Sequence, residues 1–165
     1  SKLSTDQIKK ITKNFMEHYD NGGCLTLDIY QKIEDFIKEI HKNHIKLYIA
    51  TNKRENPTIK IINHLKWDRY FERIYCIDSY PLKRRKKGEL LRLLMNKEDL
   101  LANRSLYIGD KYSDYLAAKE NKILFIGAAW DKTDFSDYCQ NQFEEIRTLN
   151  NDSINKIIRT LKSQS

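Results

Sequence analysis

Apolar residues recur every three or four positions between residues 5 and 40, which predicts two amphipathic helices. The first covers residues 5–19 and carries its apolar face on Ile8, Ile11, Phe15 and Tyr19. Thr5 or Asp6 is expected to cap this helix, and residues 21–23 (Asn-Gly-Gly) are expected to end it. The second helix is expected to start at Thr26 or Asp28, with an apolar face on Ile29, Ile33, Phe36, Ile37 and Ile40.

From residue 45 onward the pattern changes, because short apolar runs alternate with helical segments. We interpret residues 45–51, 73–77, 105–108 and 123–126 as buried strands, with a shorter strand near 143–146. The intervening segments have helical spacing, and Pro57 suits the first turn of one of them. This alternation predicts an α/β fold with a parallel sheet covered by helices on both faces. Residues 1–26 stand outside the alternation and are expected to be an appendage.

Composition narrows the classes of protein and of partner. A length of 165 residues fits one domain, and 40% hydrophobic with 11% aromatic residues excludes a disordered chain. The net charge of +7 favours anionic partners without choosing among them. The three cysteines lack metal-ligand spacing and the N-terminus is polar, so we expect reduced thiols and a cytoplasmic location. The longest apolar run, residues 123–130, is too short to span a bilayer, and no membrane partner is expected.

The clearest chemical signal is Gly109-Asp110-x-x-x-Asp114, at the point where a predicted strand runs into a helix. The glycine is expected to relax the turn. The two carboxylates are expected to hold one magnesium ion, which prefers oxygen ligands and takes one or two carboxylates together with water and phosphate. The alternative is structural: Asp114 starts the helix and interacts with its dipole, and Asp110 forms the turn.

Two other loops follow predicted strands in the same way. Thr51-Asn52-Lys53 ends a buried strand, where a hydroxyl and free N–H groups can hold a phosphate oxygen. Lys86 or Lys87 precedes a helix and can offset the charge of a transferring phosphoryl group. The carboxyl ends of parallel strands meet at one edge of a sheet, where open α/β folds bind ligands. The alternative for Thr51-Asn52-Lys53 is an ordinary helix cap after a strand. The alternative for the lysine segment is a solvated basic loop over residues 83–87.

The order of these segments resembles the haloacid dehalogenase superfamily of phosphohydrolases, and within it the phosphoglycolate phosphatase type. The resemblance rests on residues 45–53 (IKLYIATNK), 18–30 (HYDNGGCLTLDIY), the GDxxxD segment and residues 127–130 (GAAW). It departs from the family at the lysine segment, which reads KKGELL where Lys-Pro is usual. The resemblance implies a Rossmann-like three-layer fold, with residues 1–26 as part of a helical cap and 27–165 as the core.

The family's first motif, an Asp-x-Asp-x-Thr segment that supplies the nucleophile, has no match in this sequence. By resemblance, the strand that carries it lies between the strands ending at Thr51 and Asp110. Acids are present before residue 44, but each falls in a predicted helix or turn: Asp6, Glu17, Asp20, Asp28, Glu34, Asp35 and Glu39. We therefore expect that the strands ending at Thr51 and Asp110 either pair directly or take a strand from another chain, including by self-association.

These observations predict a magnesium-dependent phosphatase site for a small phosphorylated metabolite, nearly inactive without the nucleophile. Thr51 and Asn52 would bind phosphate, Lys87 (or Lys86) would neutralise charge, and Asp110 with Asp114 would hold the metal. One alternative is a non-catalytic binding module that keeps the fold and an anion site. Another is a basic nucleic-acid binder using residues 83–87, a partner we do not expect because no nucleic-acid-binding motif supports it.

Overall fold

The computed structural model describes residues 3–81, 86–130, 135 and 143–163. Helices and strands alternate through most of this range, and every strand pair is parallel, which confirms the α/β class. No helix in the described ranges is long and apolar enough to cross a bilayer. In chain order the helices and strands are α1 (Thr5–Asp20), α2 (Ile33–Lys42), β1 (Tyr48–Thr51), α3 (Glu55–His64), β2 (Arg73–Cys76), α4 (Lys87–Lys97), β3 (Leu106–Gly109), α5 (Tyr112–Glu120), β4 (Leu124–Ala128), β5 (Glu144–Ile146) and α6 (Asn151–Ser163).

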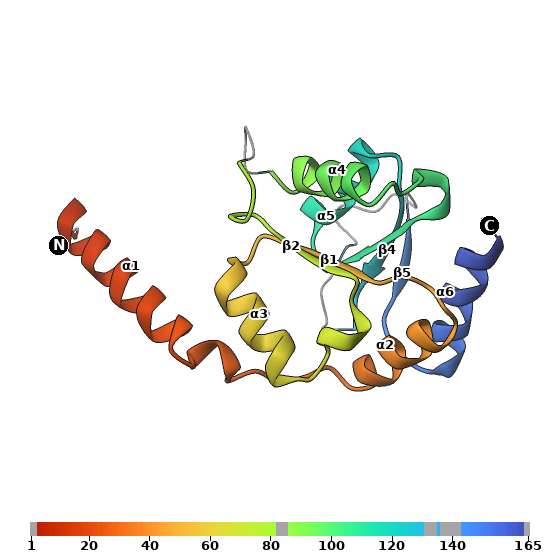
Figure 1. The fold of residues 1–165 in the computed structure, drawn as a ribbon, viewed down its shortest axis with the longest axis horizontal. Coiled ribbons are helices and arrows are strands. Elements are labelled where there is room, and N and C mark those ends of the chain that lie inside the picture. The colour runs from red at the N-terminus through yellow and green to blue at the C-terminus, as the bar shows by residue number, and fades with distance from the viewer. Residues whose placement is uncertain (1–2, 82–85, 131–134, 136–142, 164–165) are drawn as a thin grey trace.

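Helix α1 projects away from the strands, with its C-terminal end nearest α3 (Figure 1). None of its residues is buried, and its apolar side chains at Ile8, Ile11 and Phe15 are more than half exposed. Its cap is Ser4, which forms a capping box with Gln7, so the expected caps at residues 5 and 6 are wrong. Ser4 supplies the same hydroxyl chemistry one residue earlier.

Helix α2 starts later than the sequence pattern predicts. Residues 26 to 30 are not helical, and the helix begins at Ile33, after Lys32 in a left-handed conformation with φ of 69°. The caps expected at Thr26 and Asp28 are therefore wrong, and Ile29 is exposed instead of lying on the buried face. A left-handed residue interrupts helical geometry, whatever the apolar spacing across it.

Among the described residues the strands form two separate sheets, one of β1 and β2 and one in the order β3–β4–β5. Within each pair the registers are regular; Thr51 pairs with Cys76, and Gly109 with Gly127. No strand pairing joins β1 to β3 in the described part of the chain, so the expected direct pairing of these strands is wrong.

Two hydrophobic clusters pack on opposite faces of the strands. One joins α4 and α5 to Tyr75 and Phe125, with Tyr48 and Ala50 of β1 packed against it. The other joins α2 and α6 to Ile126 and Ile146, with Leu106 and Ile108 of β3 packed against it. Helices therefore cover both faces, as the sequence predicts, even though the sheet beneath them is divided.

Candidate functional site

The most buried charged contact in this region joins α4 to α5. Lys87 is the first residue of α4, and its Nζ lies 2.7 Å from Oδ1 of Asp114 in the first turn of α5. The Asp114 side chain is 2% exposed and the Lys87 side chain 14% exposed. Lys86, by contrast, is exposed and precedes the helix as its N-cap. Of the two candidate lysines, Lys87 is the one that reaches an acid of the GDxxxD segment.

The two oxygens of Asp114 have different surroundings. Oδ2 accepts a hydrogen bond from the backbone N–H of Lys111 at 3.2 Å, so the helix-start interpretation of this residue is correct for one oxygen. Oδ1 is buried and, apart from the nearby ammonium group, has no aligned hydrogen-bond donor among the described residues. The ion pair with Lys87 leaves this oxygen a second lone pair, which a cation or a further hydrogen-bond donor can occupy.

Gly109 is required here for space, not for turn geometry. A Cβ atom at this position would lie 2.5 Å from Cβ of Asp114 and 2.7 Å from its Oδ2. The backbone of Gly109 has no left-handed conformation, so the expectation that the glycine relaxes the turn is wrong. Its missing side chain lets Asp114 fold back against the end of β3.

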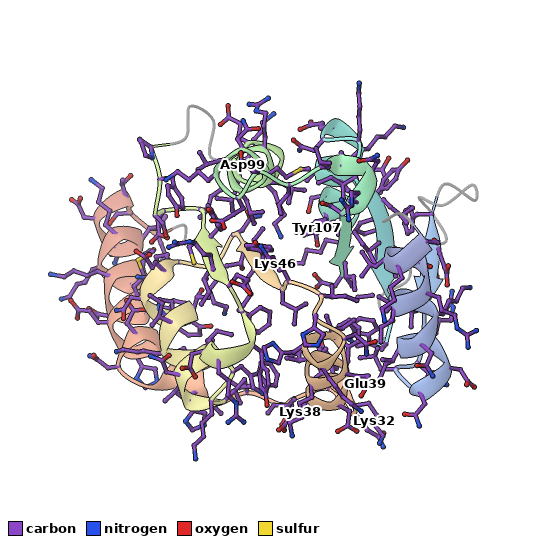
Figure 2. All side chains as sticks on the ribbon, turned by 45° about the vertical axis from the view of Figure 1, so that its right-hand side comes forward. Lys32, Lys38, Glu39, Lys46, Asp99 and Tyr107 are labelled. Carbon is purple, nitrogen blue, oxygen red and sulfur yellow. The ribbon has the colours of Figure 1, made fainter. Side chains whose placement is uncertain are left out.

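Tyr107 is a neighbour of this site that the sequence did not single out. Burial, reinforced by the nearby carboxylates of Asp114 and Asp110, raises the pKa of Tyr107 well above its usual range. Figure 2 shows its side chain on β3, on the side of that strand that faces β1. A tyrosine before a Gly-Asp pair carries no recognisable motif, so periodicity alone identifies it only as a strand residue.

Asp110 lies at one end of a groove of about 590 Å³ that runs between β1 and β3. Ile49 and Ala50, the residues directly before Thr51, line the same groove. Asp110 is itself exposed and Thr51 is half-buried, with its Oγ1 accepting a hydrogen bond from the backbone N–H of Lys53 at 3.1 Å. The strand that ends at Thr51 and the strand that leads to Asp110 are thus walls of one groove.

The loop after β1 also contacts the end of α1. Arg54 forms a two-pronged ion pair with Asp20, at 2.7 and 2.8 Å, and Lys60 donates to the Asp20 carbonyl oxygen. Lys53 donates to the Tyr19 hydroxyl and lies over its ring, 5.0 Å from the centroid. These contacts attach α1 to the Thr51 loop and to α3, a link that the sequence did not reveal because the partners are 34 to 40 residues apart.

The structure thus brings Lys87 and Asp114 into contact and places Asp110 in the loop between β3 and α5. Asn52 is exposed beside Thr51. Most of the basic run, residues 83–85, lies outside the described residues.

The donor set suits a hard cation. Asp110 and Asp114 offer carboxylate oxygens four residues apart, and Oδ1 of Asp114 has acceptor capacity to spare. In the described ranges no group of three or more His, Cys, Asp or Glu side chains is placed to hold a metal. Magnesium completes its shell with water and phosphate and needs only one or two carboxylates, so the two acids fit its requirements.

In a comparison with protein families, the model described as haloacid dehalogenase-like hydrolase matches residues 1–128. Among curated proteins, a phosphoglycolate phosphatase of Pseudomonas fluorescens is 31% identical over 144 residues, which is 87% of this chain and 51% of the relative. A 5'-nucleotidase of Pseudomonas aeruginosa is 29% identical over 117 residues, 71% of this chain and 52% of the relative. The chain spans about half the length of these curated relatives.

Solved structures share the fold. A haloacid dehalogenase-like family hydrolase from Streptococcus pneumoniae superposes with a TM-score of 0.80 at 22% identity, over 94% of this chain and 72% of that one. A phosphatase from Clostridium acetobutylicum, described as predicted, gives a TM-score of 0.78 at 19% identity, over 95% of this chain and 72% of that one. At such identities the likeness concerns the fold alone.

Proposed function

Because the chain belongs to the haloacid dehalogenase-like hydrolase family, we propose that the loops around Asp110 and Asp114 form most of a magnesium-dependent phosphatase site. The substrate class is a small phosphorylated metabolite, as for the phosphoglycolate phosphatases among the relatives. The observation that carries the proposal is the buried contact between Lys87 and Asp114, next to the exposed carboxylate of Asp110. A division into a cap remnant at residues 1–26 and a core at 27–165 is part of the proposal, as is a cytoplasmic location.

Each residue has a role that its chemistry suits. The Thr51 hydroxyl and the N–H groups of the loop at Asn52 bind phosphate oxygens. Lys87, held at the start of α4, offsets the negative charge of the phosphoryl group in the transition state. The Lys111 N–H orients Asp114, so that this carboxylate keeps one position while the substrate changes charge.

Asp110 and Oδ1 of Asp114 would hold magnesium, which supplies charge neutralisation and a template for the phosphate when it is bound. In the described ranges Asp110 is the one charged residue that lines the groove. The acids between residues 6 and 39, among them Asp20 in its pair with Arg54, lie away from its walls. The chain on its own is therefore expected to bind metal and phosphate but to turn over very slowly, because none of the side chains that the structure describes is placed to form a covalent intermediate.

Calorimetric titration of the 165-residue chain with magnesium, and then with inorganic phosphate in its presence, tests this proposal. We expect magnesium to be needed for phosphate binding, and Asp110→Asn to weaken magnesium binding at least about tenfold. The matched control is Asp99→Asn. Asp99 is exposed and follows the opposite end of α4 from Lys87, about 18 Å away by helical rise, and asparagine tolerates its φ of 50°. Magnesium binding that Asp110→Asn leaves unchanged would refute the proposal.

Turnover separates the phosphatase from its alternatives. Robust hydrolysis of an aryl phosphate by this chain, abolished in Asp110→Ala, would show that a nucleophile is present and that the expected inactivity is wrong. Metal and phosphate binding without turnover is also what a non-catalytic binding module predicts.

A further inference from the structure

The turn that follows α1 contains Asn21 and Gly22, the one Asn-Gly pair in the sequence. Asn21 is the C-cap residue of α1, and its backbone N–H donates to the carbonyl oxygen of Glu17. The residue is exposed, and its carboxamide forms no hydrogen bond with the described residues. The side chain is therefore free to change rotamer.

The peptide unit between Asn21 and Gly22 is also unrestrained. Neither the Asn21 carbonyl oxygen nor the Gly22 N–H takes part in a backbone hydrogen bond within the described part of the chain. The next bond along this turn belongs to the Gly22 carbonyl oxygen, which accepts from the Leu25 N–H at 2.9 Å. Rotation of this one peptide plane consequently breaks no hydrogen bond.

Gly22 leaves open space around its peptide nitrogen. Its φ is 131°, a backbone conformation that L side chains rarely adopt, and a Cβ atom built there would meet nothing within 4 Å. Asn21 has a ψ of 16°, so its Cα–C bond must rotate to bring the Gly22 nitrogen beside Cγ. Because glycine passes easily between positive and negative φ, the residue after the rotating plane can follow it.

Two other asparagines that end helices are held more firmly. The side-chain amide of Asn43 donates to the Glu39 carbonyl oxygen at 2.9 Å, and that of Asn121 donates to the Ala117 carbonyl oxygen at 2.8 Å. Each is followed by a residue with a long or bulky side chain instead of glycine. Asn21 differs from both in its neighbour and in the freedom of its carboxamide.

We propose that Asn21 is a site of spontaneous deamidation through a cyclic imide, and that the product loosens α1 from the Thr51 loop. The site is a covalent modification of the turn itself and needs no enzyme, because water is the only co-reactant. The inference rests on the geometry of this turn, and not on the proposed phosphatase function.

The reaction balances in two steps. The Gly22 nitrogen attacks Cγ of Asn21, the bond from Cγ to Nδ2 breaks, and the proton of the Gly22 N–H leaves with Nδ2 as ammonia. Water then opens the ring at either of its two carbonyl carbons and returns a proton to the Gly22 nitrogen. Opening at one carbon gives aspartate, and opening at the other gives isoaspartate, whose main chain runs through Cβ. Overall, one water is consumed and one ammonia is released.

Both products disturb the contacts that hold the end of α1. The new carboxylate lies at the C-terminal end of the helix, where the helix dipole disfavours negative charge. Asp20, the preceding residue, already engages Arg54 through both carboxylate oxygens, so a neighbouring carboxylate competes for the same guanidinium group. In isoaspartate the main chain is also longer by one methylene group, directly after these contacts. The last turn of α1 should therefore lose its fixed position against the Thr51 loop.

Ageing the 165-residue chain at mildly alkaline pH, followed by peptide mapping with mass spectrometry, tests the site. We expect Asn21 to react roughly tenfold or more faster than Asn14, which is exposed on the same helix but is followed by Phe15. Direct hydrolysis of the amide gives aspartate alone, so isoaspartate, detected with an isoaspartyl methyltransferase, identifies the cyclic route. Asn21→Gln should abolish the isoaspartate signal, because the longer side chain closes a ring far more slowly. Asn14→Gln is the matched control and should leave the signal unchanged.

A parallel incubation in urea separates the effect of the folded turn from that of the dipeptide. The unfolded chain places no structural restraint on Asn21, so its rate is the reference. We expect the native rate to lie within about tenfold of the urea rate, since no hydrogen bond opposes rotation of the peptide plane. A native rate far below this range, or equal native rates at Asn21 and Asn14, would overturn the assignment of the site.

The consequence for α1 is measured on the isolated product. Cation-exchange chromatography separates the deamidated chain, because it has gained a negative charge. We expect limited proteolysis within α1 to be several-fold faster in this species than in the fresh chain, and no such increase in Asn21→Gln aged in the same way. Equal cleavage rates in the two species would overturn the proposed loosening. All measurements are made with EDTA present, so their failure and failure of the magnesium titrations are separate results.

Discussion

Replacing Lys87 by methionine removes the ammonium group from a buried carboxylate while keeping most of the side-chain volume. The Asp114 side chain is 2% exposed, and its Oδ1 has no other aligned donor among the described residues. Removing one partner of a buried ion pair costs about 3–5 kcal/mol, because the other charge is left uncompensated. The Lys111 N–H still donates to Oδ2, so we expect the lower part of this range.

Urea unfolding followed by tryptophan fluorescence, with EDTA present, measures this loss in the free energy of unfolding. For Lys87→Met we expect a loss of about 3 kcal/mol at pH 7, or a Tm lower by roughly 6–12 °C. Combining it with Asp114→Asn should recover about 2 kcal/mol relative to the sum of the single changes. Lys10→Met, at an exposed position on α1, is the control and should stay within about 0.5 kcal/mol of the parent. A Lys87→Met loss below about 1 kcal/mol, or additive single changes, would refute the assignment of a buried, coupled pair.

Three further predictions concern the surroundings of this pair. Gly109→Ala should lower the free energy of unfolding in urea by about 2–4 kcal/mol, because the added Cβ would lie 2.5 Å from Asp114 Cβ. Gly88→Ala is the matched control and should cost less than about 1 kcal/mol, since there the added Cβ meets the movable end of Glu120. Equal losses in the two variants would contradict the steric role of Gly109. Asp20→Asn breaks the ion pair with Arg54 and should speed proteolysis within α1. The global free energy of unfolding should change by less than about 1 kcal/mol, because α1 buries no residue. An unchanged cleavage rate would show that other contacts hold α1 in place. Burial raises the folded-state pKa of Tyr75 and Tyr107 above the unfolded value, so their contribution to stability is complete below about pH 10 and is lost as the pH rises further. Tyr107→Phe should therefore flatten the decline of the free energy of unfolding above about pH 10. An identical decline in that variant would exclude Tyr107 as its source.

Much of the fold follows from periodicity, because helices and parallel strands leave different apolar spacings. The strands at 48–51 and 106–109 lie where short runs end, and their order placed Asp110 and Lys87 next to helix starts. The start of α2 did not follow, because the left-handed Lys32 leaves no apolar signature. The role of Gly109 also needed coordinates, since close approach of another side chain is a tertiary property. The same holds for Tyr107 and for the pair of Asp20 with Arg54.

The two hydrophobic clusters each draw residues from both sheets. Tyr48 of β1 packs in the same cluster as Phe125 of β4, and Leu47, just before β1, packs in the same cluster as Ile126. Side chains thus couple two sheets that share no ladder hydrogen bond in the described part of the chain. The molecule should consequently melt in one cooperative step, with far-UV circular dichroism and tryptophan fluorescence giving coincident transitions, even though its backbone ladders are separate.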